Sequence, residues 1–253
     1  MPAMAKPFLL GVLGGMGPLA TLDFQHKLLQ ATPADSDQQQ LPSVVWNVPQ
    51  IADRQKALAG LGPSPLPQLL QGIEKLNQAG ASHIAIPCNT AHHWYDELSR
   101  ASNAPLLHIV DATMASLANL AHKPQRVGVI ATQGTLDAGW YQQRLTQQGI
   151  EVLLPNDDEL QQWFVPGCYA VKRGALHEGG ELLAKQANAL LERGAQQLIL
   201  ACTEVPVALE AIAVPFLAQT CDPSQALAQQ CAQIWLDYRH SYSTYIQRNN
   251  LNK

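Results

Sequence analysis

Short apolar runs alternate with longer amphipathic stretches along most of the chain. We expect strands at residues 8–13, 43–48, 83–87, 106–110, 126–131, 150–154, 197–201 and 214–219. Residues 65–80 and 180–194 carry apolar positions at helical spacing and end in glycine, which suits a helix C-terminus. This alternation is typical of βαβ units wound right-handed around a parallel sheet, so the sequence predicts an α/β fold.

The two halves of the chain repeat one pattern. AGASHIAIPCNT at residues 79–90 aligns without a gap with RGAQQLILACTE at residues 193–204, which places Cys88 over Cys202. Two further matched pairs keep nearly the same separation: Gly11 with Gly128, and Asp111 with Asp222. All βαβ units share apolar runs, but they do not share glycine, cysteine and aspartate in one order. The repetition therefore indicates duplication of one structural plan.

The duplication predicts two similar α/β domains with central parallel sheets, related by pseudo-twofold symmetry. We place the first domain over residues 1–115 and the second over residues 116–253, with part of the C-terminal helix packing back on the first. Because clefts between related domains commonly bind ligands, we expect the active site there. Beyond residue 236 we expect a final helical turn and a frayed tail.

Composition and charge restrict the class of ligand. Hydrophobic residues make up 47% of the 253 residues, enough for cores that need no metal or disulfide. The net charge of −4 argues against a broad electrostatic surface for nucleic acid or anionic lipid. No apolar run approaches the ~20 residues of a membrane span. We expect a small molecule as partner, with no nucleic acid and no membrane.

The five cysteines form no paired framework and no Cys-x-x-Cys motif, which favours a reducing, cytoplasmic setting. HEGGE at residues 177–181 lacks the second histidine of a metalloprotease site, and its glycines would break the helix. GVLGGMG at residues 11–17 lacks the full dinucleotide-binding pattern and is interpreted as a first strand and turn. We therefore expect no metal and no nucleotide.

Cys88 and Cys202 each follow a predicted strand and precede a predicted helix start. Open α/β sheets bind ligands at the carboxyl ends of their strands, so both thiols should lie at the functional edge of their domains. The unpaired N–H groups of a helix start favour negative charge and predict a lowered thiol pKa. A lone free cysteine is usually a small core residue, but the repeated position points to function.

Two opposed thiols have one obvious chemical use. A thiolate can remove a proton from one face of a carbon while the opposite thiol delivers a proton to the other face, which inverts the centre. A single nucleophilic cysteine, as in a hydrolase, would need no second copy. We therefore predict Cys88 and Cys202 as a pair of catalytic bases.

Five segments together resemble the aspartate racemases of the aspartate/glutamate racemase superfamily: GVLGGMGPLAT (11–21), IPCNTAH (86–92), HIVDAT (108–113), ATQGT (131–135) and CTEVP (202–206). The resemblance runs from about residue 8 to residue 235. It implies a homodimeric enzyme that interconverts L- and D-aspartate without pyridoxal phosphate, another cofactor or a metal. Glutamate racemases typically carry histidine after the second Cys-Thr, where this chain has Glu204.

The resemblance also implies which residues bind an acidic amino acid. The α-carboxylate would be held by Asn89, Thr90, Thr132 and Thr203. The side-chain carboxylate would be held by Arg54 and Lys172, and Arg173 competes with Lys172 for this role. Met16 and the backbone N–H groups of its glycine-rich loop would cover the substrate.

The chain departs from the family near the second cysteine and the lysine. Ala201 stands where glycine usually precedes the cysteine, and Pro166-Gly167 puts the helix that carries Lys172 in doubt. Cys168, on the same segment, is a candidate to approach the cleft. Cys221 and Cys231 are expected in the core.

Alternatives of two classes stay open. A racemase of glutamate or of broad specificity could share the two cysteines. An amidase or a hydantoin racemase could share them too, but neither would need two cations to bind a distal carboxylate. A non-catalytic protein could close on an amino acid without inverting it. Binding alone needs no pair of thiols, which argues against the second class.

Overall fold

The computed structural model describes residues 7–250 and, of the side chains beyond Tyr242, only that of Thr244. Its strands form two separate parallel sheets with the orders β2-β1-β3 and β5-β4-β6-β7. The strands of the first sheet are β1 (Leu10–Gly14), β2 (Ser43–Asn47) and β3 (His83–Ala85). Those of the second are β4 (Arg126–Ala131), β5 (Glu151–Leu153), β6 (Gln197–Ala201) and β7 (Thr220–Cys221). The predicted α/β fold with two parallel sheets is confirmed.

The first sheet has a fully buried central strand. All five residues of β1 are buried, and the strand runs parallel to both neighbours. Its helices are α1 (Pro18–Ala31), α2 (Arg54–Leu58), α3 (Leu66–Gln78) and α4 (Tyr95–Ala101). Helix α3 places Leu69, Ile73 and Leu76 in the core, and Gly72 allows close approach because a Cβ there would lie 2.5 Å from a Leu13 methyl carbon. The helical spacing of apolar residues therefore explains why this face of α3 packs against Leu13 of β1.

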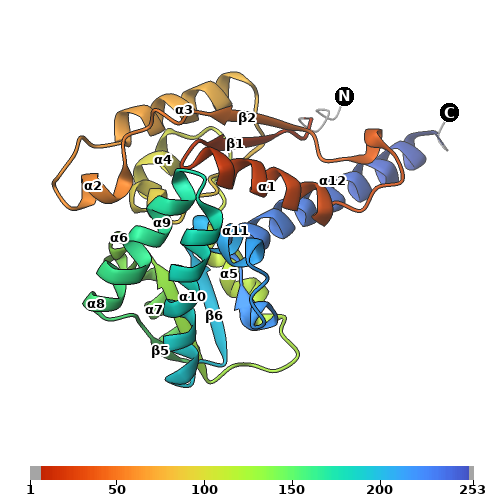
Figure 1. Cartoon of the computed structure of the whole chain (residues 1–253). Helices are drawn as coiled ribbons and strands as arrows, with labels where there is room; N and C mark the ends of the chain where they lie inside the picture. The colour runs from red at the N-terminus through yellow and green to blue at the C-terminus, as the bar shows by residue number, and fades with distance from the viewer. Residues whose placement is uncertain (1–6, 251–253) are drawn as a thin grey trace.

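The second sheet repeats this arrangement, with β4 in the central position. β6, which precedes Cys202, lies beside β4 as β3 lies beside β1. The helices of this half are α6 (Gln133–Ala138), α7 (Trp140–Gln147), α8 (Asp157–Glu159), α9 (Val165–Lys172), α10 (Leu176–Glu192) and α11 (Glu204–Ala211). Figure 1 shows the two halves one above the other, with α9 and α6 near the level where they meet.

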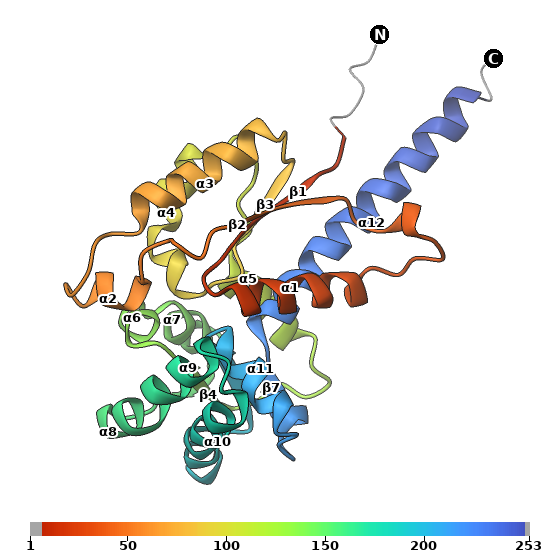
Figure 2. The ribbon, with the colours of Figure 1, turned by 45° about the horizontal axis from the view of Figure 1, so that its top comes forward.

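Helices α5 (Ile109–Ala118) and α12 (Pro223–Asn250) connect the halves. Helix α12 packs against both α1 and α5, and Figure 2 shows it running out beside α1. Trp235 on α12 donates a hydrogen bond to the Gln39 carbonyl at 3.0 Å and packs its ring against Phe8 at 5.2 Å. Part of the C-terminal helix thus packs against the first half of the chain.

Two predicted strands are wrong. Residues 106–110 contribute only an isolated bridge between Leu106 and Ile84, and the apolar run continues into α5, where burial of a helix produces the same pattern. Residues 214–219 form no strand, because a short 3₁₀ helix covers Leu217–Gln219 and β7 begins at Thr220. Short apolar runs do not distinguish a strand from buried helix.

The chain end also differs from expectation. Beyond residue 236 the chain continues as α12 through Asn250, so a short final turn and frayed tail are wrong over that range. The extreme ends of the two predicted domains, residues 1–6 and 251–253, lie outside the described residues. Within residues 7–250, no helix combines the length and apolar character needed to cross a membrane.

Candidate active site

Both repeated cysteines line one small cavity between the two sheets. Cys88 follows β3 after two residues and Cys202 directly follows β6, and the two are 5% and 6% exposed. We call this cavity the inner chamber; it is lined by Met16, Asp53, Arg54, Gln55, Cys88, Asn89, Thr90, Thr132, Lys172, Cys202, Thr203 and Glu204. All nine site residues predicted from the sequence are in this set. Asp53, Gln55 and Glu204 were not predicted as site residues.

The inner chamber opens toward a larger one. The volume of the inner chamber is about 20 Å³, enough for roughly one water molecule. An outer cavity of about 430 Å³ adjoins it, and the two share Asp53, Arg54, Lys172, Thr203 and Glu204. An amino acid is larger than the inner chamber, so a ligand that contacts the two thiols would also extend into the outer cavity past the shared residues.

The glycine-rich loop after β1 forms one wall of the inner chamber. Gly15 has φ +99, and a Cβ there would lie 2.3 Å from the backbone of Val48. Only glycine fits this combination of left-handed backbone and close approach. The Gly15 N–H donates to Thr21 Oγ1 at 2.8 Å, which fixes the loop to α1. The loop thereby holds Met16, which is 3% exposed, against the chamber.

Hydroxyl and amide groups form another part of the chamber wall. Thr90 Oγ1 lies 3.0 Å from Thr132 Oγ1, so the two halves are joined by a hydrogen bond inside the chamber. Tyr141 donates its hydroxyl to Asn89 Oδ1 at 2.6 Å, which orients the amide. The Asn89 Nδ2 group is buried and has no hydrogen-bond partner among the described residues. A donor in this state suits a ligand carboxylate.

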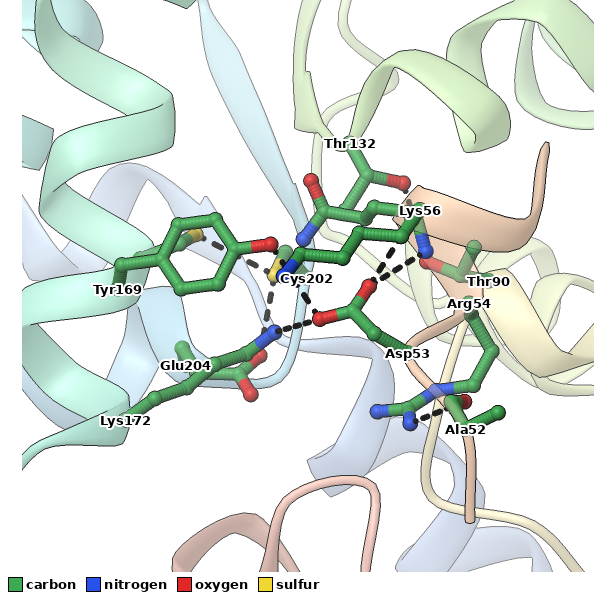
Figure 3. A network of polar contacts seen from close by, with 12 residues as sticks. Ala52, Asp53, Arg54, Lys56, Thr90, Thr132, Tyr169, Lys172, Cys202 and Glu204 are labelled. Carbon is green, nitrogen blue, oxygen red and sulfur yellow. Dashed lines mark hydrogen bonds and ion pairs between the residues drawn. The ribbon is translucent and has the colours of Figure 1, made fainter. Parts of the chain in front are cut away.

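The two predicted cations both reach the chamber and already have partners there. Lys172 Nζ lies 3.9 Å from Asp53 Oδ2, to which Tyr169 also donates its hydroxyl at 3.3 Å (Figure 3). Arg54 is 8% exposed and donates from Nη1 to the carbonyls of Ile51 and Ala52 at 3.1 and 3.0 Å. Arg54 therefore supports its own loop as well as facing the cavity.

Asp53 is a charged group of the site. It caps α2 by accepting the Gln55 N–H at 2.9 Å and the Lys56 N–H at 3.1 Å. Burial opposes its ionisation, but the hydrogen bond from the Lys56 N–H and the charges of Lys172 and Arg54 lower its pKa below the ordinary value. An Asp before a short helix is an ordinary cap in sequence, so only the contact with Lys172 shows that it belongs to the site.

The helix that carries Lys172 is not interrupted. A π-helical segment over Leu160–Phe164 leads directly into helix α9, which begins at Val165 and includes Pro166 in its first turn. Gly167 packs against α10, because a Cβ there would lie 3.0 Å from Leu183 Cγ. The doubt about Lys172 is thus removed. Arg173, the competing cation, pairs instead with Glu178 at the surface.

The expectation of lowered thiol pKa values is wrong for the free protein. Burial raises the pKa of Cys88, against the charge of Arg54 and the Ala91 N–H. The pKa of Cys202 is well above its ordinary value because its sulfur lies 3.6 Å from that of Cys168, because it is buried, and because Glu204 is nearby. The helical segment after Cys88 begins as a 3₁₀ helix over Thr90–Trp94 and continues as α4 from Tyr95. Both pKa shifts favour the protonated thiol over the thiolate.

His92 holds the Cys88 loop in place. Its Nε2 accepts the Ile109 N–H at 3.2 Å, which leaves Nδ1 to donate to the Cys88 carbonyl at 2.9 Å. Burial lowers the pKa of His92, so the ring is neutral. Both ring nitrogens are occupied by backbone groups, which makes His92 a support for the loop and excludes it as the partner of the Cys88 thiol.

Glu204 is the second charged residue that sequence reasoning missed. It accepts a hydrogen bond from Cys202 Sγ at 3.1 Å through Oε2, and its Oε1 is buried without a partner in the described part of the chain. The sequence contained one signal, since Glu204 lies two residues after the repeated cysteine. In the sequence, Glu204 distinguished the chain from glutamate racemases, which typically carry histidine there. Its contact with Cys202 became visible only in the structure.

Known proteins match the chain over most of its length. A family model described as Asp/Glu/Hydantoin racemase matches residues 13–231. The broad specificity amino-acid racemase RacX of Bacillus subtilis is 28% identical over 239 residues, which cover 91% of this chain and 100% of RacX. The structure of a Picrophilus torridus aspartate racemase is 28% identical with a TM-score of 0.78, covering 90% of this chain and 94% of that one.

A more distant structure supports the fold alone. It is a glutamate racemase from Francisella tularensis in complex with D-glutamate, 19% identical with a TM-score of 0.62, covering 92% of this chain and 82% of that one. Two parallel sheets, a cysteine after the corresponding strand of each, and a family match that spans both halves agree with one another. The chain belongs to the Asp/Glu/hydantoin racemase family.

Proposed function

We propose that the protein racemises aspartate by moving the α-proton between Cys88 and Cys202 without a cofactor. The observation that carries this proposal is that thiols from the two separate sheets line the same inner chamber. A non-catalytic binding protein would need neither thiol, and a hydrolase would need only one. The resemblance further suggests a homodimer, which light scattering of the purified protein would test.

The proposed chemistry begins when one thiol loses its proton to solvent water as substrate binds. The thiolate takes the α-proton from its face, and the electron pair of the broken C–H bond moves into the α-carboxylate. The opposite thiol then gives its proton to the other face and becomes the thiolate. A C–H bond forms again with inverted configuration, and the reverse reaction exchanges the two roles.

The α-carboxylate gains negative charge during this reaction and needs donors. Asn89 Nδ2 and Arg54 Nε are buried donors of lining residues that have no hydrogen-bond partner among residues 7–250, and Tyr141 fixes the orientation of Asn89. Thr90 and Thr132 present hydroxyl groups on the same wall. Donors fixed before the reaction stabilise a developing anion without reorganisation. For this reason we assign to the α-carboxylate the donors Asn89, Thr90, Thr132 and Thr203.

Aspartate is favoured by the two cations. Arg54 and Lys172 line both the inner chamber and the outer cavity, where a side-chain carboxylate would extend. One observation favours a broader substrate range as the second candidate: Asp53 already partners Lys172, which reduces the positive charge available. The full-length similarity to the broad specificity racemase RacX points the same way.

A panel of single enantiomers followed by chiral chromatography tests the proposal. Incubation of L-aspartate, L-glutamate, L-asparagine and L-alanine should yield the D enantiomer fastest from aspartate. Comparable rates from all four would support the broad-range candidate. No D enantiomer from any of them, together with no α-hydrogen exchange in deuterated water, would leave a binding protein as the better account.

A further inference from the structure

The chamber supplies partners for the carboxylates of an amino acid, but the proposed function leaves its α-ammonium group unassigned. We propose that Glu204 binds this ammonium group through Oε1 and so selects amino acids over acids of the same shape without an amino group. The inference rests on the proposed function, because it names the substrate class of the same site.

Glu204 has the geometry of a carboxylate that lacks a ligand. The side chain is 6% exposed, and Oε2 is 3.1 Å from Cys202 Sγ and 3.4 Å from Thr203 Oγ1. Oε1 is buried with no hydrogen-bond partner, and Glu204 forms no ion pair within residues 7–250. Burial opposes the charge of Lys172 and the charge of Glu204 raises the pKa of Lys172, but no cation of the described residues lies within ion-pair distance of Glu204. A cationic ligand at the buried Oε1 would therefore stabilise the site.

The second carboxylate of the chamber cannot take this role without breaking existing contacts. Asp53 Oδ1 accepts the N–H groups of Gln55 and Lys56. Asp53 Oδ2 accepts the Tyr169 hydroxyl and pairs with Lys172. Both oxygens are therefore in use, and Glu204 Oε1 is the remaining anionic acceptor among the described residues of the chamber.

The chamber carries one group for each charge on the α-carbon of an amino acid. The chamber presents an unpartnered donor, Asn89 Nδ2, from the first half of the chain and an unpartnered anionic acceptor, Glu204 Oε1, from the second. These two groups complement the carboxylate and the ammonium on one α-carbon. Because Glu204 contacts Cys202, an ammonium held by Oε1 places the adjacent α-carbon close to that thiol.

Ammonium binding also promotes ionisation of Cys202. The negative charge of Glu204 is one of the causes that hold the pKa of Cys202 well above its ordinary value. A cation beside Glu204 offsets that charge and favours the thiolate. A substrate with an amino group therefore helps to prepare the base, and a deaminated analogue does not.

Calorimetric titration of matched ligands tests the inference. The pairs are L-aspartate with succinate and L-alanine with propionate, which differ by the amino group. In Glu204→Gln, affinity for the amino acids should fall about ten-fold or more, while affinity for succinate should stay the same or rise because a negative charge is lost. Glu210→Gln, an exposed change on the same helix, is the control and should alter neither.

The outcomes separate this inference from the proposed function. Equal losses for both members of a pair, or no loss for either, would overturn the role of Glu204. Glu204→Asp, which keeps the charge, should retain part of the preference for amino acids even where Glu204→Gln folds poorly, and its failure to do so would also overturn the role. Wild-type protein that binds aspartate without racemising it would refute the proposed function alone, and wild-type protein that binds no amino acid would refute both.

Discussion

Cys202 has neighbours that control the ionisation of its sulfur. The Cys168 thiol and the Glu204 carboxylate raise its pKa together with burial, and Lys172 acts in the opposite direction. Two sulfurs 3.6 Å apart cannot both ionise readily, because the second thiolate would face the first. Cys168 therefore belongs to the chemistry of the site although it does not line the inner chamber.

Cys168→Ala should lower the pKa of Cys202. The pH midpoint for alkylation of Cys202 by iodoacetamide should move to lower pH, because the thiolate is the reacting form. Mass spectrometry of the peptide that contains Cys202 measures the rate at each pH. Cys231→Ala, which removes another buried thiol, should leave the midpoint unchanged. An unchanged midpoint in Cys168→Ala would show that the sulfur contact has no electrostatic effect.

Arg54→Ala should reduce kcat/KM for aspartate far more than for alanine. The reason is the loss of a cation that faces the cavity, worth about 1.5–3 kcal/mol for a charged hydrogen bond. Initial rates by chiral chromatography measure both substrates. Since Arg54 also donates to the carbonyls of Ile51 and Ala52, equal losses on both substrates would mean that it only supports its loop.

For individual residues, the family resemblance predicted which side chains line the site, but it did not predict the pKa shifts of the two thiols. The nine predicted residues line one chamber, and seven of them lie in the five segments that carry the family resemblance. The state of the thiols was predicted wrongly because burial and contact with Cys168 are properties of packing that local sequence does not contain. Asp53 and Glu204 were missed for the same reason.

Helix α5 shows how one half-buried histidine affects an element. His108 caps the helix by accepting the Val110 N–H at 3.2 Å, and its ring lies 4.8 Å from that of His92. Burial and the neighbouring His92 lower the pKa of His108 to about 3. The folded protein thus keeps this ring neutral at a pH where the unfolded chain protonates it.

His108→Asn should make the stability less sensitive to acid. Between the ordinary histidine pKa of about 6.5 and the folded value of about 3, the unfolded chain binds more protons, so stability falls as pH falls through this window. Asparagine keeps an acceptor for the cap and does not titrate. The fall in Tm from pH 7 to pH 5 should be smaller than in wild type by about 2–4 °C. His122→Asn, at an exposed site, should not change it.

Elements with strong periodicity were predictable and short apolar runs were not. Helices α3 and α10 correspond to the two amphipathic stretches, and β4 and β6 match their predicted bounds. Residues 106–110 were mistaken for a strand because α5 is buried on several sides and loses its polar stripe. Apolar content alone does not distinguish a strand from a buried helix.

A buried charge cluster joins the two halves of the molecule. Lys27 on α1 is 5% exposed, and its Nζ lies 2.5 Å from both Asp23 on α1 and Asp222 at the start of α12. The pKa of Lys27 is raised because these two carboxylates outweigh the effect of burial. The cluster therefore holds the ends of two helices that come from opposite ends of the sequence.

Lys27→Met should destabilise the fold by about 3–5 kcal/mol, because it leaves two largely covered carboxylates, Asp23 and Asp222, without the buried cation that pairs with both. Thermal unfolding at pH 7 measures the change, with Lys75→Met on the exposed face of α3 as control. Lowering the pH should partly restore the variant, since protonation of Asp23 or Asp222 removes the repulsion. A Tm within one degree of wild type would show that the cluster contributes nothing.

The duplicated plan was readable because two matched cysteines recur with the same neighbours. The two sheets follow from it, whereas the domain boundary at residues 115 and 116 stays a prediction. The role of α12 as a connection between halves could be anticipated only in part, since its length depends on contacts with α1 and α5.

Exchange of the α-hydrogen in deuterated water tests the two-thiol account most directly. Proton NMR would follow L- and D-aspartate separately with the wild type, Cys88→Ser and Cys202→Ser. A serine hydroxyl is a far weaker acid than a thiol, so each variant should lose racemisation by orders of magnitude and keep its Tm. One variant should exchange only L-aspartate and the other only D-aspartate. Normal racemisation by either variant, or equal exchange of both enantiomers by both, would contradict the account.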